Sequence, residues 1–171
     1  MMGLKMKISL TDIIKEHLDT FRKSDGRFLV VDLMIFLFIP IALTVLIFIF
    51  VFKEIPEKFV DSLLISFSIL TPLLFGLLPM SFSLIDNDYV SSKGFELVNE
   101  FKANVLFTIL LSLLLVLLLL IWFLTVNWKC IMDIVICWLF IEILLHLFLI
   151  LNRFNDLINE YIKLKKRHKN T

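Results

Sequence analysis

Four long runs of apolar residues dominate the chain and predict its main helices. The runs extend over Phe28 to Phe52, Leu63 to Leu84, Val105 to Val126 and Cys130 to Leu151. Each run reaches the length of about 20 residues that an α-helix needs to cross roughly 30 Å of hydrocarbon. We therefore expect an all-α fold, an integral membrane four-helix bundle. It forms a single transmembrane domain, 1–171, with spans of about 28–52, 60–84, 105–126 and 130–151.

A shorter amphipathic pattern precedes the first run. Apolar residues recur at the spacing of one helical face, with charged residues opposite, at Leu10, Ile13, Ile14, Leu18 and Phe21. This pattern predicts an amphipathic cytoplasmic helix within the segment 9–26. Such a helix either lies in the headgroup region of the membrane or packs against other cytoplasmic helices.

The last two runs differ in what they should contact. The third is nearly continuous Leu from Ile109 to Ile121, with Ser112 as its only polar residue, and we expect it to face lipid. The fourth continues without Pro or Gly into the tail 152–171, which predicts a cytoplasmic extension of the fourth helix. The tail ends in a basic run that attracts anionic lipid or simply marks the cytoplasmic side, Lys165, Lys166, Arg167, His168 and Lys169.

In the second run, Ser62, Ser66 and Gly76 share a small, polar face suited to close helix approach.

Composition and charge strengthen the membrane interpretation. The chain is 60% hydrophobic and only 19% charged, which is more apolar side chain than a soluble domain of 171 residues buries. With four spans and both termini on one side, 14 of the 17 Lys and Arg residues fall on that side. The positive-inside rule therefore predicts cytoplasmic N- and C-termini. A net charge of +1 without an aromatic-interleaved basic surface argues against direct binding of nucleic acid.

The candidate chemistry is a set of ionisable residues inside the predicted spans. Glu142 and His146 lie one helical turn apart in the fourth span, and Arg153 continues the same helical face. Asp133 points the opposite way, near the outer end of the span, where we expect access to water. Asp32 lies near the start of the first span, where the helix dipole favours a carboxylate. An ionisable group at the bilayer centre costs about 2.5 to 3.5 kcal/mol, so these residues need compensating partners.

Three interpretations of Glu142 and His146 stay open. They form a buried polar pair that assists packing and assembly, they line an aqueous path or proton relay between subunits, or they bind a lipid or another ligand. Because the other spans of one chain supply few polar partners for this face, we expect a homo-oligomer. We expect no metal, since one Glu and one His do not close a metal site, and no cofactor. Without a nucleophile or metal constellation, we also do not expect an enzyme.

The layout resembles the small four-span membrane components of bacterial anti-phage defence systems. The resemblance rests on the amphipathic segment Ser9 to Gly26, the first span with Asp32, the near absence of outer domains and the short basic tail. That group includes the membrane subunit of Kiwa and membrane effectors associated with nucleotide-signalling operons. The resemblance implies an oligomer in the bacterial inner membrane that senses or perturbs the membrane with a soluble cytoplasmic partner. The alternatives are a small ion or proton channel or transporter that uses Glu142 and His146, and a non-catalytic membrane anchor or scaffold subunit.

Overall fold

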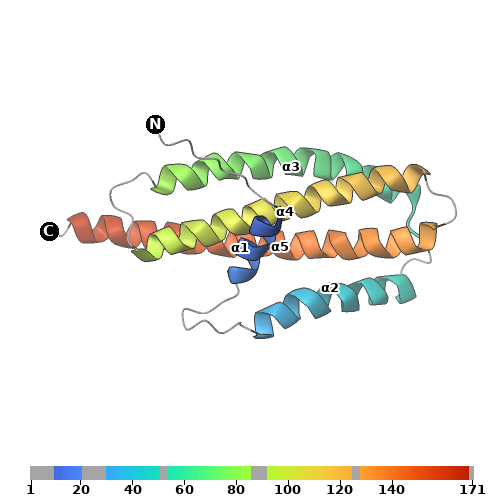
Figure 1. Ribbon diagram of the computed structural model, residues 1–171, viewed down its shortest axis with the longest axis horizontal. Helices are drawn as coiled ribbons and strands as arrows, with labels where there is room; N and C mark the ends of the chain where they lie inside the picture. The colour runs from blue at the N-terminus through green and yellow to red at the C-terminus, as the bar shows by residue number, and fades with distance from the viewer. Residues whose placement is uncertain (1–9, 21–29, 51–53, 86–91, 125–127, 170–171) are drawn as a thin grey trace.

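The fold is helical in every regular element of the described chain (Figure 1). The computed structural model describes residues 10–20, 30–50, 54–85, 92–124 and 128–169; within them, the side chains at 30–33, 35, 37, 81–85, 92, 93 and 164–169 lie outside the description. The helices are α1 (Leu10–Asp19), α2 (Val30–Phe50), α3 (Glu57–Ile85), α4 (Ser92–Leu124) and α5 (Lys129–Lys169).

Three of these helices are long and apolar enough to cross a membrane, so the protein is a membrane protein. The candidate spans are Glu57–Met80 in α3, Gly94–Leu124 in α4 and Lys129–Lys163 in α5. Within the described residues, α2 contributes the shorter apolar segment Phe38–Phe50. The fourth span predicted over 28–52 therefore stays a prediction.

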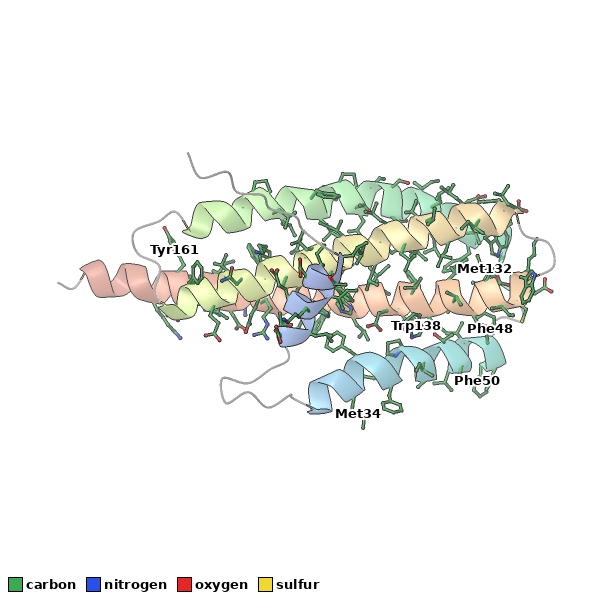
Figure 2. The ribbon with its side chains drawn as sticks, in the orientation of Figure 1. Met34, Phe48, Phe50, Met132, Trp138 and Tyr161 are labelled. Atoms are coloured by element: carbon green, nitrogen blue, oxygen red, sulfur yellow. The ribbon has the colours of Figure 1, made fainter. Side chains whose placement is uncertain are left out.

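The long helices lie side by side in the order α3, α4, α5 and α2 (Figure 1). α4 packs against α3 and α5, α2 packs against α5, and α1 crosses α4. Among the described residues, no close backbone approach joins α2 to α3 or α4, so α2 forms one edge of the row. Figure 2 shows Phe48 and Trp138 between α2 and α5, whereas Phe50, which is 78% exposed, points away from the row.

The apolar core runs along α4, which corrects the expectation that this helix faces lipid. Leu115 and Leu119 are fully buried, together with Ser112, against α3 and α5. Leu117 and Leu120, on the opposite face, are about half exposed. A run of identical Leu residues has no hydrophobic asymmetry, so the pattern contained no signal for which face would be covered.

The predicted small face of α3 is exposed in the single chain. Ser62 and Ser66 donate to carbonyl oxygens one turn earlier in their own helix, at 2.8 and 2.7 Å. A side-chain carbon added at Gly76 would have no neighbouring atom within 4 Å. Within the described chain, no other helix uses this face for the close approach that its residues favour.

The predicted amphipathic helix and the predicted extension of the last helix are both present. The amphipathic pattern forms α1 over Leu10–Asp19, and residues 21–29 of the predicted segment lie outside the description. α5 continues well beyond the predicted end of the fourth span and reaches Lys169. The side chains of the basic run 165–169 lie outside the described part of the structure.

Candidate functional site

A buried histidine pair joins α1 to the long helices. His17 of α1 is 4% exposed and His146 of α5 is 1% exposed. Their Nε2 atoms lie 3.2 Å apart, although the residues are 129 positions apart in the chain. The Nδ1 atom of His17 lies 2.8 Å from Oδ1 of Asn104, a fully buried residue of α4. We call His17, Asn104, Glu142 and His146 the histidine cluster.

Aromatic rings enclose the pair. The Phe107 ring stacks on His17 with centroids 3.9 Å apart and planes 5° apart. The rings of Phe36 and Phe107 each lie 5.1 Å from the His146 ring. Residues of α1, α2, α4 and α5 therefore meet at this one place, and the imidazoles have an apolar surround that disfavours charge.

Glu142 lies beside His146 on α5. His146 Nδ1 donates to the backbone carbonyl of Glu142 at 2.9 Å and lies 3.6 Å from Oε1 of its carboxylate. The other carboxylate oxygen, Oε2, is buried without a hydrogen-bond partner among the described residues. The structure thus brings Glu142 and His146 together and adds His17 and Asn104 to them.

Sequence reasoning missed His17 and Asn104, although one signal was available. His17 falls seven residues after Leu10, which places a polar ring on the apolar face of the amphipathic helix. A polar residue in that position needs a buried partner or lies at an interface with water. Asn104 had no such signal, because it lies at the edge of the third apolar run, where polar residues are ordinary.

The environment of His17 opposes its protonation. Burial lowers the pKa of His17 from 6.5 to about 4, and the nearby charge of a protonated His146 adds to this effect. The hydrogen bond to Asn104 acts in the opposite direction. The ring is therefore neutral at pH 7.

Thr20 and a neighbouring cavity complete the contact between α1 and α4. Thr20 Oγ1 donates to the His17 carbonyl at 2.7 Å and lies 3.4 Å from Asn104 Oδ1. Beside it is a cavity of ≈ 540 Å³ with a largely acidic lining: Glu16, Asp19, Thr20, Phe95, Glu96, Asn99, Glu100 and Lys102. Lys102 Nζ lies 3.9 Å from Glu16 Oε2, a weak ion pair at the surface.

Arg153 has a partner on another helix. Its Nη1 atom lies 2.9 Å from Oε2 of Glu100, so the ion pair links the first part of α4 to the last part of α5. Arg153 shares a helical face with Glu142 and His146, as predicted from spacing, but its guanidinium is engaged with α4.

Asp133 lies in a separate cluster, at the end of the row where α4 meets α5. It is 1% exposed, and its oxygens accept from Trp122 Nε1 at 2.7 Å and from the Ile55 backbone at 3.2 Å. The Lys129 ammonium lies 4.8 Å from the centroid of the Trp122 ring. The expectation that Asp133 has access to water is wrong, because these contacts cover it. Asp32 belongs to α2, and its side chain lies outside the described part of the structure.

Comparison with known proteins does not identify the class of this protein. No family model, no characterised protein and no solved structure matches the chain. In the described residues, no group of three or more His, Cys, Asp and Glu is placed to hold a metal ion. The fold and site define an all-α membrane protein in which a short amphipathic helix is held on long apolar helices by buried histidines.

Proposed function

We propose that the protein is an oligomer of the bacterial inner membrane that senses or perturbs the membrane through α1, together with a soluble cytoplasmic partner. The observation that carries this proposal is the two-sided contact of α1. His17 joins it to α4 and α5, while Leu10, Ile14 and Leu18 are 59%, 41% and 40% exposed. One helix thus touches the core of the protein and offers apolar side chains to its surroundings.

Helix length supports a position of α1 at the membrane surface. From Asn104 to the end of α4 at Leu124 the helix is about 30 Å long at 1.5 Å per residue, which equals the thickness of the hydrocarbon. From the start of α5 at Lys129 to His146 the length is about 26 Å. α1 meets both helices near that depth and crosses them (Figure 1), as a helix lying in the headgroup region would.

Such a helix transmits a change in the membrane to the protein. Its exposed apolar residues insert among lipids, so altered lipid packing changes the free energy of the docked position. A displaced α1 removes His17 from Asn104 and His146, which leaves polar groups of α4 and α5 without partners. Because leaving buried polar groups unsatisfied costs about 1 to 3 kcal/mol each, the two positions of α1 have distinct protein conformations.

The location of the outward face of α1 tests the proposal directly. A spin label at Leu18→Cys, in full-length protein with Cys130→Ser and Cys137→Ala, is placed in lipid nanodiscs at pH 7.5. We expect the label to be accessible to oxygen dissolved in lipid and shielded from a water-soluble nickel reagent. A label at Lys15→Cys, on the polar face of the same helix, serves as the matched control and should show the opposite accessibility. A Leu18 label open to the nickel reagent would remove the basis of the proposal.

A role in anti-phage defence follows from the layout resemblance and has its own test. The gene is expressed with its natural neighbours in a host that is then challenged with phage. We expect protection to be lost in Ile14→Asn with Leu18→Asn, while protein level and assembly persist, because only the lipid-facing residues change. Protection that persists in this variant contradicts membrane sensing through α1 and favours an anchor or scaffold role.

A proton channel is the second candidate, favoured by the chain of groups from Glu142 through His146 to His17. The 3.2 Å contact between His146 and His17 lies at the long end of the hydrogen-bond range, and the 3.6 Å contact between Glu142 and His146 lies beyond it, so proton transfer along this chain of groups needs Glu142 to move closer to His146. Glu142→Gln retains size and polarity but removes the exchangeable acid. If the protein conducts protons, this variant should assemble normally and abolish proton flux into liposomes with a pH-sensitive dye. Equal flux in the variant and in the wild type excludes this path.

A further inference from the structure

The hydrogen-bond positions of the two histidines limit how many protons the pair can hold. His146 Nδ1 faces a backbone carbonyl, which only accepts, so this nitrogen carries a hydrogen. Its Nε2 atom in the neutral ring therefore presents a lone pair to Nε2 of His17. For the 3.2 Å contact to be a hydrogen bond, His17 must supply the hydrogen from its own Nε2.

Asn104 allows this arrangement both when the two rings are neutral and when the pair carries one extra proton. When the amide presents Oδ1, as in the structure, it accepts from a His17 ring protonated on both nitrogens. When the amide is turned by 180°, Nδ2 donates to Nδ1 of a neutral His17. Nδ2 has no hydrogen-bond partner among the described residues, so nothing there opposes this rotation.

A second extra proton has no place in the pair. With both rings charged, each Nε2 carries a hydrogen, and two donors face each other at 3.2 Å without an acceptor. The two charges also repel each other among aromatic rings, where water does not screen them. Moving α1 away from α5 separates the two rings and removes the conflict.

We infer that the His17 and His146 pair is an acid-sensitive latch that holds α1 on α4 and α5 and releases it when both rings are protonated. This inference adds regulation to the proposed function, and it rests on the proposal that α1 is the working element. On release, α1 keeps its apolar residues for the membrane, while His146 and Asn104 lose their contacts with His17.

The charged groups that the structure describes around the pair do not remove the conflict. On α5, the Glu142 carboxylate stabilises a first proton on His146 at 3.6 Å, but it lies on the Nδ1 side and offers no acceptor between the Nε2 atoms. On α4, Lys102 is paired with Glu16 of α1. Glu100 is paired with Arg153. From α2 the described contact is the Phe36 ring.

The latch lies next to the cavity beside α1. Thr20 lines this cavity, donates to the His17 carbonyl and lies 3.4 Å from Asn104 Oδ1, so the Asn104 side of the latch borders the cavity. Burial holds the pKa of docked His17 at about 4, whereas a ring in water has 6.5. Because the docked ring binds its proton more weakly, acid favours the undocked state. The value for docked His17 includes repulsion by a charged His146, so it describes the second proton on the pair. For this proton alone, docking is fully favoured above pH 6.5 and weakens toward pH 4, by on the order of 20-fold between pH 7 and pH 5.

Distances between spin labels on α1 and α4 test the latch. Labels are placed at Lys15→Cys and Glu96→Cys, both exposed, in full-length protein with Cys130→Ser and Cys137→Ala in nanodiscs. Between pH 7.5 and pH 5 we expect the short distance to lose population to a longer, broader one, with the docking constant falling about 20-fold. Unchanged distances over this range would overturn the latch.

Two variants assign the response to the histidines. His17→Gln retains hydrogen-bonding capacity but does not titrate, so it should abolish the change with pH. His146→Gln removes the second charge and should only weaken the change, because burial still opposes protonation of His17. Lys102→Gln is the matched control: it removes the surface pair with Glu16 and should retain the change. A response that persists in both Gln variants contradicts the latch. A lipid-exposed Leu18 label with no response to pH would reject the latch alone, whereas a water-exposed Leu18 label at pH 7.5 would reject the proposed function.

Discussion

At the scale of single residues, the ionisable groups of this protein act as contacts between helices. Arg153 joins α5 to α4 through Glu100, and Asp133 joins α5 to Trp122 and to the segment before α3. His17 and His146 join α1 to α5. Burying such groups is costly unless they are hydrogen-bonded, so each contact also fixes the relative position of the elements that supply it.

Asp133 offers the sharpest stability test at this scale. Asp133→Ala leaves the Trp122 N–H and the Ile55 N–H without their acceptor in a buried place. We expect a loss of at least about 2 kcal/mol in unfolding free energy, measured by denaturation in detergent, because two donors are left unsatisfied and each costs about 1 to 3 kcal/mol. Asp133→Asn keeps one acceptor oxygen and should lose less.

The control for this prediction is Asp61→Ala on the exposed side of α3. It removes the same side chain without uncovering a buried donor, and it should change stability by less than about 0.5 kcal/mol. Equal losses at the two positions would mean that the Asp133 contacts contribute nothing specific.

The sequence predicted single residues unevenly. Glu142 and His146 were found because ionisable residues are rare in apolar runs and their spacing places them on one face. Their partners His17 and Asn104 come from other helices, and a periodic pattern contains no information about which helices meet. The environment of Asp133 was misjudged for the same reason: its cover comes from α4 and from the segment before α3, which spacing within α5 does not reveal.

At the scale of elements, hydrophobic periodicity predicted where helices form better than how they pack. The long apolar runs and the amphipathic segment all became helices. The central place of α4 was missed, because its uniform Leu face gives no direction. The predicted four-helix bundle implies that α2 packs among the other spans, whereas among the described helices its backbone closely approaches only α5.

The buried face of α4 can be tested by truncation. Leu119→Ala removes a fully buried side chain at the junction with α3 and α5, and we expect a loss of about 2 kcal/mol in unfolding free energy. This value lies at the low end for core positions, because lipid is as apolar as the core and the loss comes from packing alone. Leu117→Ala, at a position that is 54% exposed, should be nearly neutral. A larger loss at Leu117 would place it against a second copy of the chain.

At the scale of the whole molecule, the single chain leaves two features unused. The small face of α3 is exposed, and Glu142 Oε2 is buried without a hydrogen-bond partner among the described residues. The exposed small face favours the predicted homo-oligomer, since small residues permit close helix approach. The buried Glu142 oxygen is out of reach of a second copy while the chain keeps this conformation. Cross-linking in native membranes should give discrete multiples of 20.1 kDa. A monomer by both cross-linking and native mass measurement would contradict the prediction.

The final prediction concerns the number of spans, and α2 decides it. With α2 spanning, four crossings place both termini on the cytoplasmic side, as 14 of 17 basic residues favour. If only α3, α4 and α5 cross, the two termini lie on opposite sides of the membrane. Reporter fusions at residue 1 and residue 171 distinguish these arrangements, because one reporter is active only in the cytoplasm and the other only outside it. We expect cytoplasmic signals at both ends; signals from opposite sides would show that α2 does not cross.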